Sequence, residues 1–419
     1  MTHKHSKHVQ IPYGSRTFEA LLPYTATVLS IIEPEQRMSI KYFAGALRDQ
    51  LQYNALKLDD TIIIVADKTR TCGYSTYLPV LIDVLKEYGL QEDRLRFIIA
   101  YGTHTRQSDA ECRANYGETY SKYPFIHHDC TDSNTFTDYG VTSRGVPIRL
   151  RRDIVQAGCV ITMGPICHHY FAGYGGGRKL IFPGCGEREA IYANHSLYLD
   201  KQNNRLSPGC RPGVLVGNPL AEDLFEIAEK KEADLAIHSI MNSRGEVCDI
   251  RLGSNRTSYL EASEIHARLC ESSSAPFAVV IASCGGYPKD INFIQSHKAI
   301  HNASMFVRDG GTLLLFAECR DSIGSKTFLP WYEKGGFDEA FRHLCREYEG
   351  NGGTALAMMA KTRRIRIAMV TELEEDICAR IDVEKWSSSE ALRFIHDLEA
   401  PAGHIGYIAN AGLLVHKVQ

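Results

Sequence analysis

Short runs of consecutive apolar residues recur along the chain and alternate with stretches of helical periodicity. The apolar runs are TIIIVAD (61–67), RLRFIIAYGTH (94–104), AGCVITMGP (157–165), DLAIHSIMN (234–242), FAVVIASCGG (277–286), GTLLLFAEC (311–319) and RIRIAMVTEL (364–373). Uninterrupted apolar runs of this length are typical of strands that a parallel sheet buries on both faces. Helical patterns at 75–90 and 108–117 separate the first three runs. The alternation predicts an α/β fold with mainly parallel sheets.

A Ser-rich segment, CESSSAPF at 270–277, ends a long helical pattern and precedes a fresh apolar run. A chain of 419 residues is long enough for two domains. We therefore expect an N-terminal α/β domain at 1–272, which binds the cofactor, and a C-terminal α/β domain at 273–403. The final stretch, 404–419, is expected to return and complete the first domain.

Polar loops follow the apolar runs at the carboxyl ends of the expected strands. They lie at 67–70, 102–104, 167–179 and 285–298. Ligands of open α/β sheets bind beyond the carboxyl ends of the strands. We therefore expect the four loops to converge on an active site in the cleft between the two domains.

Charge and cysteine content narrow the class of protein. The 47 basic and 50 acidic side chains give a net charge of -3, and no long block has one sign. Neither nucleic acid nor a membrane surface is therefore an expected partner. The chain has no apolar run of about 18 residues, so no membrane-spanning helix is expected. Thirteen scattered cysteines without a CxxC pair indicate reduced thiols and a cytoplasmic protein.

The Gly-rich segment YFAGYGGGRKLIFPG at 170–184 is the most distinctive stretch. It matches neither the P-loop nor the dinucleotide fingerprint, because Leu180 follows Lys179 and Arg178 replaces the third glycine. Glycines still let a ligand approach the backbone closely and offer N–H groups to an anion. The alternative is a tight turn without a ligand.

Histidines lie on both sides of this segment, at His168, His169 and His195, and His104 ends an earlier apolar run. Neutral imidazole binds nickel, zinc, copper or iron, and it also transfers protons near pH 7. Spacing alone leaves both roles open for each histidine. The HExxH signature is absent, which weakens the interpretation as a zinc hydrolase.

Five motifs, DKTR, YGTH, HYFAGYGGGRKLIFPG, NHSLY and FIQSHKAI, occur in an order and spacing that resemble the lactate racemase family. These are enzymes that use a nickel-pincer nucleotide. The resemblance runs from about residue 10 to the C-terminus and is most specific at 164–196, where His169, Lys179 and Asn194-His195 have the family's spacing.

The resemblance implies a cofactor, nickel pyridinium-3,5-bisthiocarboxylic acid mononucleotide, that is covalently bound to Lys179. It implies that His195 is the metal ligand and that His104 and His169 are alternating catalytic acid and base. The remaining implied residues are Asp67, Gly175, Gly176 and Gly177 for the cofactor, and Arg70, Gln295 and Lys298 for the substrate.

The function implied by the resemblance is that of a racemase or epimerase of a small 2-hydroxy acid, working by reversible hydride transfer to the cofactor. Separate cofactor-biosynthesis enzymes would be partners. Two departures indicate a substrate larger than lactate: Ile294 replaces a frequent aromatic residue, and GNGGTALAMMAKT at 350–362 lacks the family's tryptophan. The alternatives are a zinc-type metal-dependent hydrolase or lyase, and a non-catalytic nucleotide-binding protein.

Overall fold

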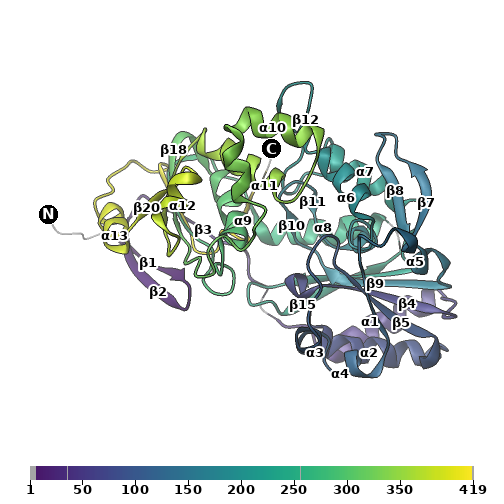
Figure 1. Ribbon diagram of the computed structural model, residues 1–419. Helices are drawn as coiled ribbons and strands as arrows, with labels where there is room; N and C mark the ends of the chain where they lie inside the picture. Colours follow the sequence, from purple (N-terminus) through teal and green to yellow (C-terminus); the bar gives the residue numbers. More distant parts are fainter. Residues whose placement is uncertain (1–5, 35, 255, 418–419) are drawn as a thin grey trace. The chain divides into compact units, whose positions relative to one another are not determined.

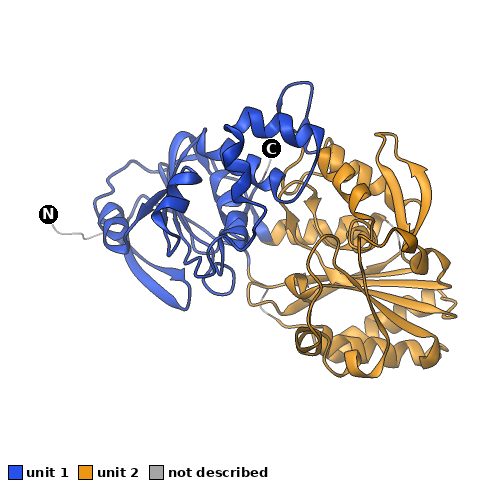
Figure 2. Cartoon of the chain, viewed as in Figure 1, with its two compact units in different colours: residues 1–32, 198–208, 270–419 blue, residues 33–197, 209–269 orange. Residues whose placement is uncertain are grey.

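The computed structural model describes residues 6–34, 36–254 and 256–417. The chain forms two compact units (Figure 2), each made of several segments. Unit 1 comprises residues 1–32, 198–208 and 270–419, and unit 2 comprises residues 33–197 and 209–269. Each unit contains a six-stranded sheet covered by helices. The expected α/β fold with mainly parallel sheets is confirmed.

The sheet of unit 2 has the strand order β15-β14-β9-β4-β5-β6. Its strands are β4 (Thr61–Ala66), β5 (Leu95–Ala100), β6 (Phe125–His127), β9 (Cys159–Pro165), β14 (Leu235–Met241) and β15 (Val247–Gly253). All neighbours pair in parallel except β15, which lies antiparallel at the edge next to β14. Every residue of β4 and of β9 is buried, as their uninterrupted apolar runs predict.

Helices and short elements complete unit 2 (Figure 1). The helices are α1 (Ile40–Tyr53), α2 (Tyr74–Glu87), α3 (Asp109–Tyr116), α4 (Glu118–Lys122), α5 (Arg152–Gln156), α6 (Arg188–Ser196), α7 (Pro219–Ala228) and α8 (Arg256–Cys270). Two hairpins are β7 (Phe136–Val141) with β8 (Pro147–Arg151) and β10 (His168–His169) with β11 (Gly173–Tyr174). The 3-10 turns η1 (Lys68–Arg70) and η4 (Gly177–Leu180) follow β4 and β11.

The sheet of unit 1 is parallel throughout, in the order β20-β19-β18-β17-β21-β3. Its strands are β3 (Thr27–Leu29), β17 (Phe277–Ser283), β18 (Val307–Phe316), β19 (Arg366–Val370), β20 (Glu384–Trp386) and β21 (Ile405–Ile408). The helices are α9 (Phe293–Ser304), α10 (Phe337–Arg346), α11 (Gly352–Thr362), α12 (Glu375–Arg380) and α13 (Ser388–His396). The hairpin of β1 (Ser6–Tyr13) and β2 (Arg16–Pro23) also belongs to this unit.

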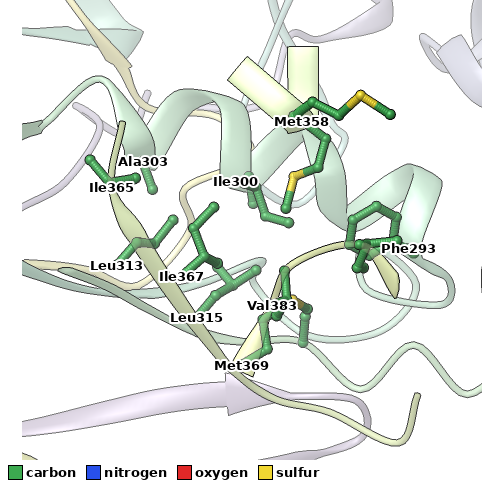
Figure 3. Packing of buried hydrophobic residues seen from close by; sticks show 14 of the residues in the cluster. Phe293, Ile300, Ala303, Leu313, Leu315, Met358, Ile365, Ile367, Met369 and Val383 are labelled. Atoms are coloured by element: carbon green, nitrogen blue, oxygen red, sulfur yellow. The ribbon is translucent and has the colours of Figure 1, made fainter. Parts of the chain in front are cut away.

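Alternating residues of β18 enter two different cores. Leu313 and Leu315 pack in the larger cluster with residues of α9 and α11 (Figure 3). Leu314 and Phe316 pack in a second cluster with residues of the β1–β2 hairpin and α13. Successive side chains of a strand point to opposite faces, so both faces of this sheet are buried. No helix in the described part of the chain is long and apolar enough to cross a membrane.

The observed division differs from the expected domains at both ends of the chain. Strand β21 lies between β17 and β3 in the sheet of unit 1, so 404–419 does not return to the first domain. Residues 1–32 group with the same unit. All four residues of β21 are buried, which a strand with neighbours on both sides satisfies.

Candidate active site

A buried carboxylate holds a histidine where β4 and β5 end. Asp67 is 3% exposed, and its Oδ1 accepts a hydrogen bond of 2.9 Å from the Thr69 backbone N–H, which fixes the start of η1. Its Oδ2 lies 2.6 Å from Nδ1 of His104. Because β4 and β5 are parallel neighbours, their carboxyl ends bring these two side chains together.

Burial alone would raise the pKa of Asp67, but the hydrogen bond and positive charge of His104 outweigh it and lower this pKa to about 2. Asp67 is therefore ionised at neutral pH. An ionised carboxylate only accepts hydrogen bonds, so Nδ1 of His104 carries the proton. Nε2 of His104 is left as the basic nitrogen, on a side chain that is about half exposed.

Close packing requires glycine at three positions of the Gly-rich segment. A Cβ at Gly176 (φ 77°) would overlap the carbonyl oxygen of Pro165, and one at Gly177 (φ 53°) would lie 2.5 Å from the ring of Tyr259. A Cβ at Gly175 would lie 3.1 Å from Sγ of Cys167. The absence of a Cβ therefore lets this segment lie close to Pro165, Cys167 and Tyr259. A role of the three glycines in holding the cofactor stays a prediction.

Lys179 is carried by η4 and is half-buried. Burial, followed by the positive charges of Arg70 and Arg178, lowers the pKa of its amine well below the ordinary lysine value. The amine is therefore far more nucleophilic at neutral pH than that of an exposed lysine.

His195 lies near the end of α6 and interacts electrostatically with Lys179 and His104. Burial and then the charge of Lys179 lower the pKa of His195 to about 3. Its imidazole is therefore neutral at physiological pH, which is the form that binds a metal ion. These interactions bring the ends of β4, β5 and η4 and the end of α6 into one site.

The two consecutive histidines have different surroundings. The ring of His169 lies 4.7 Å from the ring of Phe171, and the ring of Phe171 lies 5.0 Å from that of His195. The ring of His168 instead lies 4.8 Å from that of His266 on α8. Neighbouring residues of a strand point to opposite sides, so the two rings of β10 have different neighbours, Phe171 for His169 and His266 for His168.

Phe171 is a site residue that the sequence reasoning missed. It contacts both His169 and His195 edge-on. An aromatic residue inside a Gly-rich segment and two positions after a histidine is the signal that could have found it.

Two of the three predicted substrate-binding residues, Gln295 and Lys298, lie in unit 1. Gln295 and Lys298 occupy the first turns of α9, where Asn292 caps the helix by accepting from the Gln295 N–H. Nζ of Lys298 donates a hydrogen bond of 2.7 Å to Oε1 of Gln295. The two side chains therefore form one polar pair, and their approach to Arg70 in unit 2 stays a prediction.

The described residues contain no group of three or more His, Cys, Asp or Glu side chains that could hold a metal ion together. The role of His195 as a metal ligand stays a prediction.

Family models identify the group of proteins. Residues 13–207 match the lactate racemase N-terminal domain, and residues 272–346 match the lactate racemase C-terminal domain. Together the two matches cover more than half of the chain. The chain belongs to the lactate racemase family. The family resemblance that the motifs indicated is confirmed.

Two lactate racemases are among the similar proteins. That of Thermoanaerobacterium thermosaccharolyticum is 29% identical over 274 residues, which are 65% of this chain and 63% of that protein. That of Lactiplantibacillus plantarum is 24% identical over 331 residues, which are 76% of this chain and 77% of that protein. The alignment with the first thus spans somewhat less than two thirds of its length.

Solved structures share the fold of this lactate racemase family member. The lactate racemase apoprotein of T. thermosaccharolyticum aligns over 98% of this chain and 100% of its own, with a TM-score of 0.88 and 24% identity. A protein of Thermotoga maritima aligns over 93% of this chain and 100% of its own, with a TM-score of 0.70 and 16% identity.

Proposed function

We propose that the protein is a racemase or epimerase of a small 2-hydroxy acid that works by reversible hydride transfer to a lysine-tethered nickel-pincer nucleotide. The observation that carries the proposal is the cluster of Lys179, His195 and His104, in which burial and nearby positive charges lower the pKa of the Lys179 amine and of the His195 imidazole, so that both are uncharged. Family membership supports the same function.

The residues fit this cofactor. A neutral Lys179 amine is the nucleophile that a thioamide tether requires, and a neutral His195 is a nickel ligand. The other cofactor-binding candidates are Asp67, Gly175, Gly176 and Gly177. When bound, the cofactor would supply a pyridinium ring that accepts and returns hydride, with nickel held on it.

His104 and His169 would move the hydroxyl proton of the substrate. Nε2 of His104 is available as a base because Asp67 fixes the proton on Nδ1. His169 comes from a different element, β10, and its Nδ1 accepts a hydrogen bond of 3.3 Å from the Ala172 N–H, which orients the ring. A reaction that proceeds through a planar keto acid needs one such group for each face.

Three cationic or polar side chains would bind the substrate carboxylate. The guanidinium of Arg70 can bind it through two parallel hydrogen bonds. Lys298 adds a point charge, and Gln295 can donate a hydrogen bond. Lactate is the substrate named for the two relatives. Ile294 and the tryptophan-free α11 favour a larger 2-hydroxy acid for this chain.

We further infer a cytoplasmic enzyme that depends on cofactor-biosynthesis enzymes as partners. All thirteen cysteines are free thiols, which fits a reducing compartment. The two alternatives are a zinc-type hydrolase or lyase that uses the same histidines, and a nucleotide-binding protein without catalysis.

Intact-protein mass spectrometry with metal analysis tests the proposal. The protein is produced together with the cofactor-making enzymes, beside a Lys179→Ala variant and a Lys68→Ala control from the same face of unit 2, where Lys68 forms an exposed ion pair with Glu111. We expect a nucleotide-sized mass increase with nickel in the wild type and the control, and neither in Lys179→Ala. Zinc without an adduct would favour the hydrolase. An adduct without turnover of any 2-hydroxy acid would favour the binding protein.

A further inference from the structure

A separate cavity of about 590 Å³, counting the part open to solvent, lies within unit 2. It is bounded by one face of β9 and β14, by η4, by the end of α7 and by the start of α8. Among its lining residues are Thr162, Arg178, Phe225, His238, Arg256 and Tyr259. Asp67, His104, Lys179 and His195 do not line it; Gly177 is the one cofactor-binding candidate that does.

Arg178 places an unbalanced charge against this cavity. Its guanidinium carbon lies 4.0 Å from the ring centroid of Phe225 and 4.5 Å from that of Tyr259. All three guanidinium nitrogens are buried, and no residue in the described part of the chain accepts a hydrogen bond from them. Stacking on aromatic rings compensates the charge in part, but it leaves five N–H donors without acceptors.

A second arginine shares the same ring. The guanidinium carbon of Arg256, the first residue of α8, lies 4.0 Å from the Phe225 centroid, and Arg256 forms no ion pair within residues 6–34, 36–254 and 256–417. Two guanidinium groups that contact one ring repel each other unless an anion lies between or beside them. The positive end of the α8 dipole adds to this positive potential.

The remaining charged groups of the cavity are Lys231, Glu229 and Glu232. Burial, and then the charge of Glu229, raise the pKa of Glu232. No positive charge of the described residues lowers this pKa, so Glu232 does not offset the charges of Arg178 and Arg256. With Arg178 and Arg256, the cavity therefore has three cations and two carboxylates at different places on its wall.

We propose that this cavity binds a small organic anion whose phosphate or carboxylate group contacts Arg178 and Arg256. The body of the ligand would lie against the ring of Tyr259 and the apolar wall. Glu229 and Glu232 would accept hydrogen bonds from its hydroxyl or amino groups, which favours a phosphorylated metabolite such as a nucleoside monophosphate. The proposal does not depend on the proposed racemase activity.

The position of Arg178 gives such a ligand a route to the candidate active site. Arg178 and Lys179 are neighbours in η4, and they face the cavity and the histidine cluster respectively. An anion bound to Arg178 would hold η4 on the sheet and so restrict the position of Lys179. The cavity would thus act as an effector site.

Isothermal titration calorimetry on the full chain tests the site with three probes: adenosine monophosphate, inorganic phosphate and benzoate. The decisive variant is Arg256→Gln, because Arg256 is exposed and its loss leaves the core intact. Arg268→Gln is the matched control, since Arg268 lies on the same helix and pairs with the exposed Glu264. Arg70→Gln controls for binding in the candidate active site.

We expect at least one probe to bind, with an affinity that Arg256→Gln lowers about tenfold and that both other variants leave unchanged. Binding of both phosphates but not of benzoate identifies a phosphoryl ligand, and the converse identifies a carboxylate. Arg178→Met should abolish binding, with its melting temperature as a check on folding. The proposal is overturned if no probe binds at millimolar concentration, if Arg256→Gln has no effect, or if Arg70→Gln abolishes the binding.

Discussion

Replacing Asp67 by asparagine changes one atom of a buried side chain and reverses a hydrogen bond. The amide oxygen of the new side chain can still accept from the Thr69 N–H, so the turn after β4 is kept. An NH₂ group, which is a donor, replaces Oδ2, the atom that lies 2.6 Å from Nδ1 of His104 in the wild type. Nδ1 must then accept, and the ring proton moves to Nε2, where it blocks the base.

The size of the effect follows from the lost interaction. A hydrogen bond to a charged group contributes about 1.5–3 kcal/mol, and this one is needed most when His104 becomes an imidazolium. A loss of about 2–3 kcal/mol at the transition state lowers kcat/KM on the order of 100-fold. For a pair of enantiomers the loss must be equal in the two directions, because their equilibrium constant is unity.

The assay is chiral chromatography of 2-hydroxy acids with cofactor-loaded enzyme. The control is Asp60→Asn, because Asp60 lies just before β4 and pairs with Arg96 instead. Nickel content and adduct mass are measured in both variants, so that a loss of cofactor binding by Asp67→Asn is separated from the loss of the His104 base. The reasoning is refuted if Asp67→Asn keeps kcat/KM within about threefold of the wild type while binding the cofactor fully.

Two further predictions concern stability. Gly176→Ala should lower the free energy of unfolding by about 1–3 kcal/mol more than Gly145→Ala, because both glycines have φ near 77° but only at Gly176 does the new Cβ meet an atom, the carbonyl oxygen of Pro165; equal melting temperatures would contradict this. Burial lowers the pKa of His128 and His238 from 6.5 to about 4, so the folded state binds fewer protons than the unfolded state between these values. The free energy of unfolding should therefore fall by about 1.4 kcal/mol per pH unit for each histidine as the pH drops through this window. Urea unfolding of the wild type and of a His238→Asn variant measures the slope, and equal slopes would show that His238 does not contribute.

The fold class could be read from the sequence because buried parallel strands leave a strong local signal. The apolar runs at 61–67, 157–165 and 277–286 contain β4, β9 and β17. The sequence did not predict which sheet the segment 404–419 joins, since pairing between distant strands depends on the whole sheet and not on the segment itself.

The site residues could be named from motifs, but their geometry could not. The spacing places His168 and His169 side by side without saying which one contacts Phe171 and which one contacts His266, and this depends on the pleat of β10. The contacts of Phe171 and the hydrogen bond from His104 to Asp67 join residues on different elements, so no local pattern contains them.

Because each unit is made of several chain segments, the two units can complete their folding only in a certain order while the chain is made at the ribosome. All segments of unit 2 have been made once residue 269 is complete. Strand β3 is among the first elements to be made, yet its neighbour in the sheet, β21, follows almost the whole chain later. Until then β3 has no neighbour in the described sheet, and β17 lacks one of its two neighbours. A nascent chain that stalls before residue 405 would therefore expose pairing surface for other strands, and such chains should depend on chaperones.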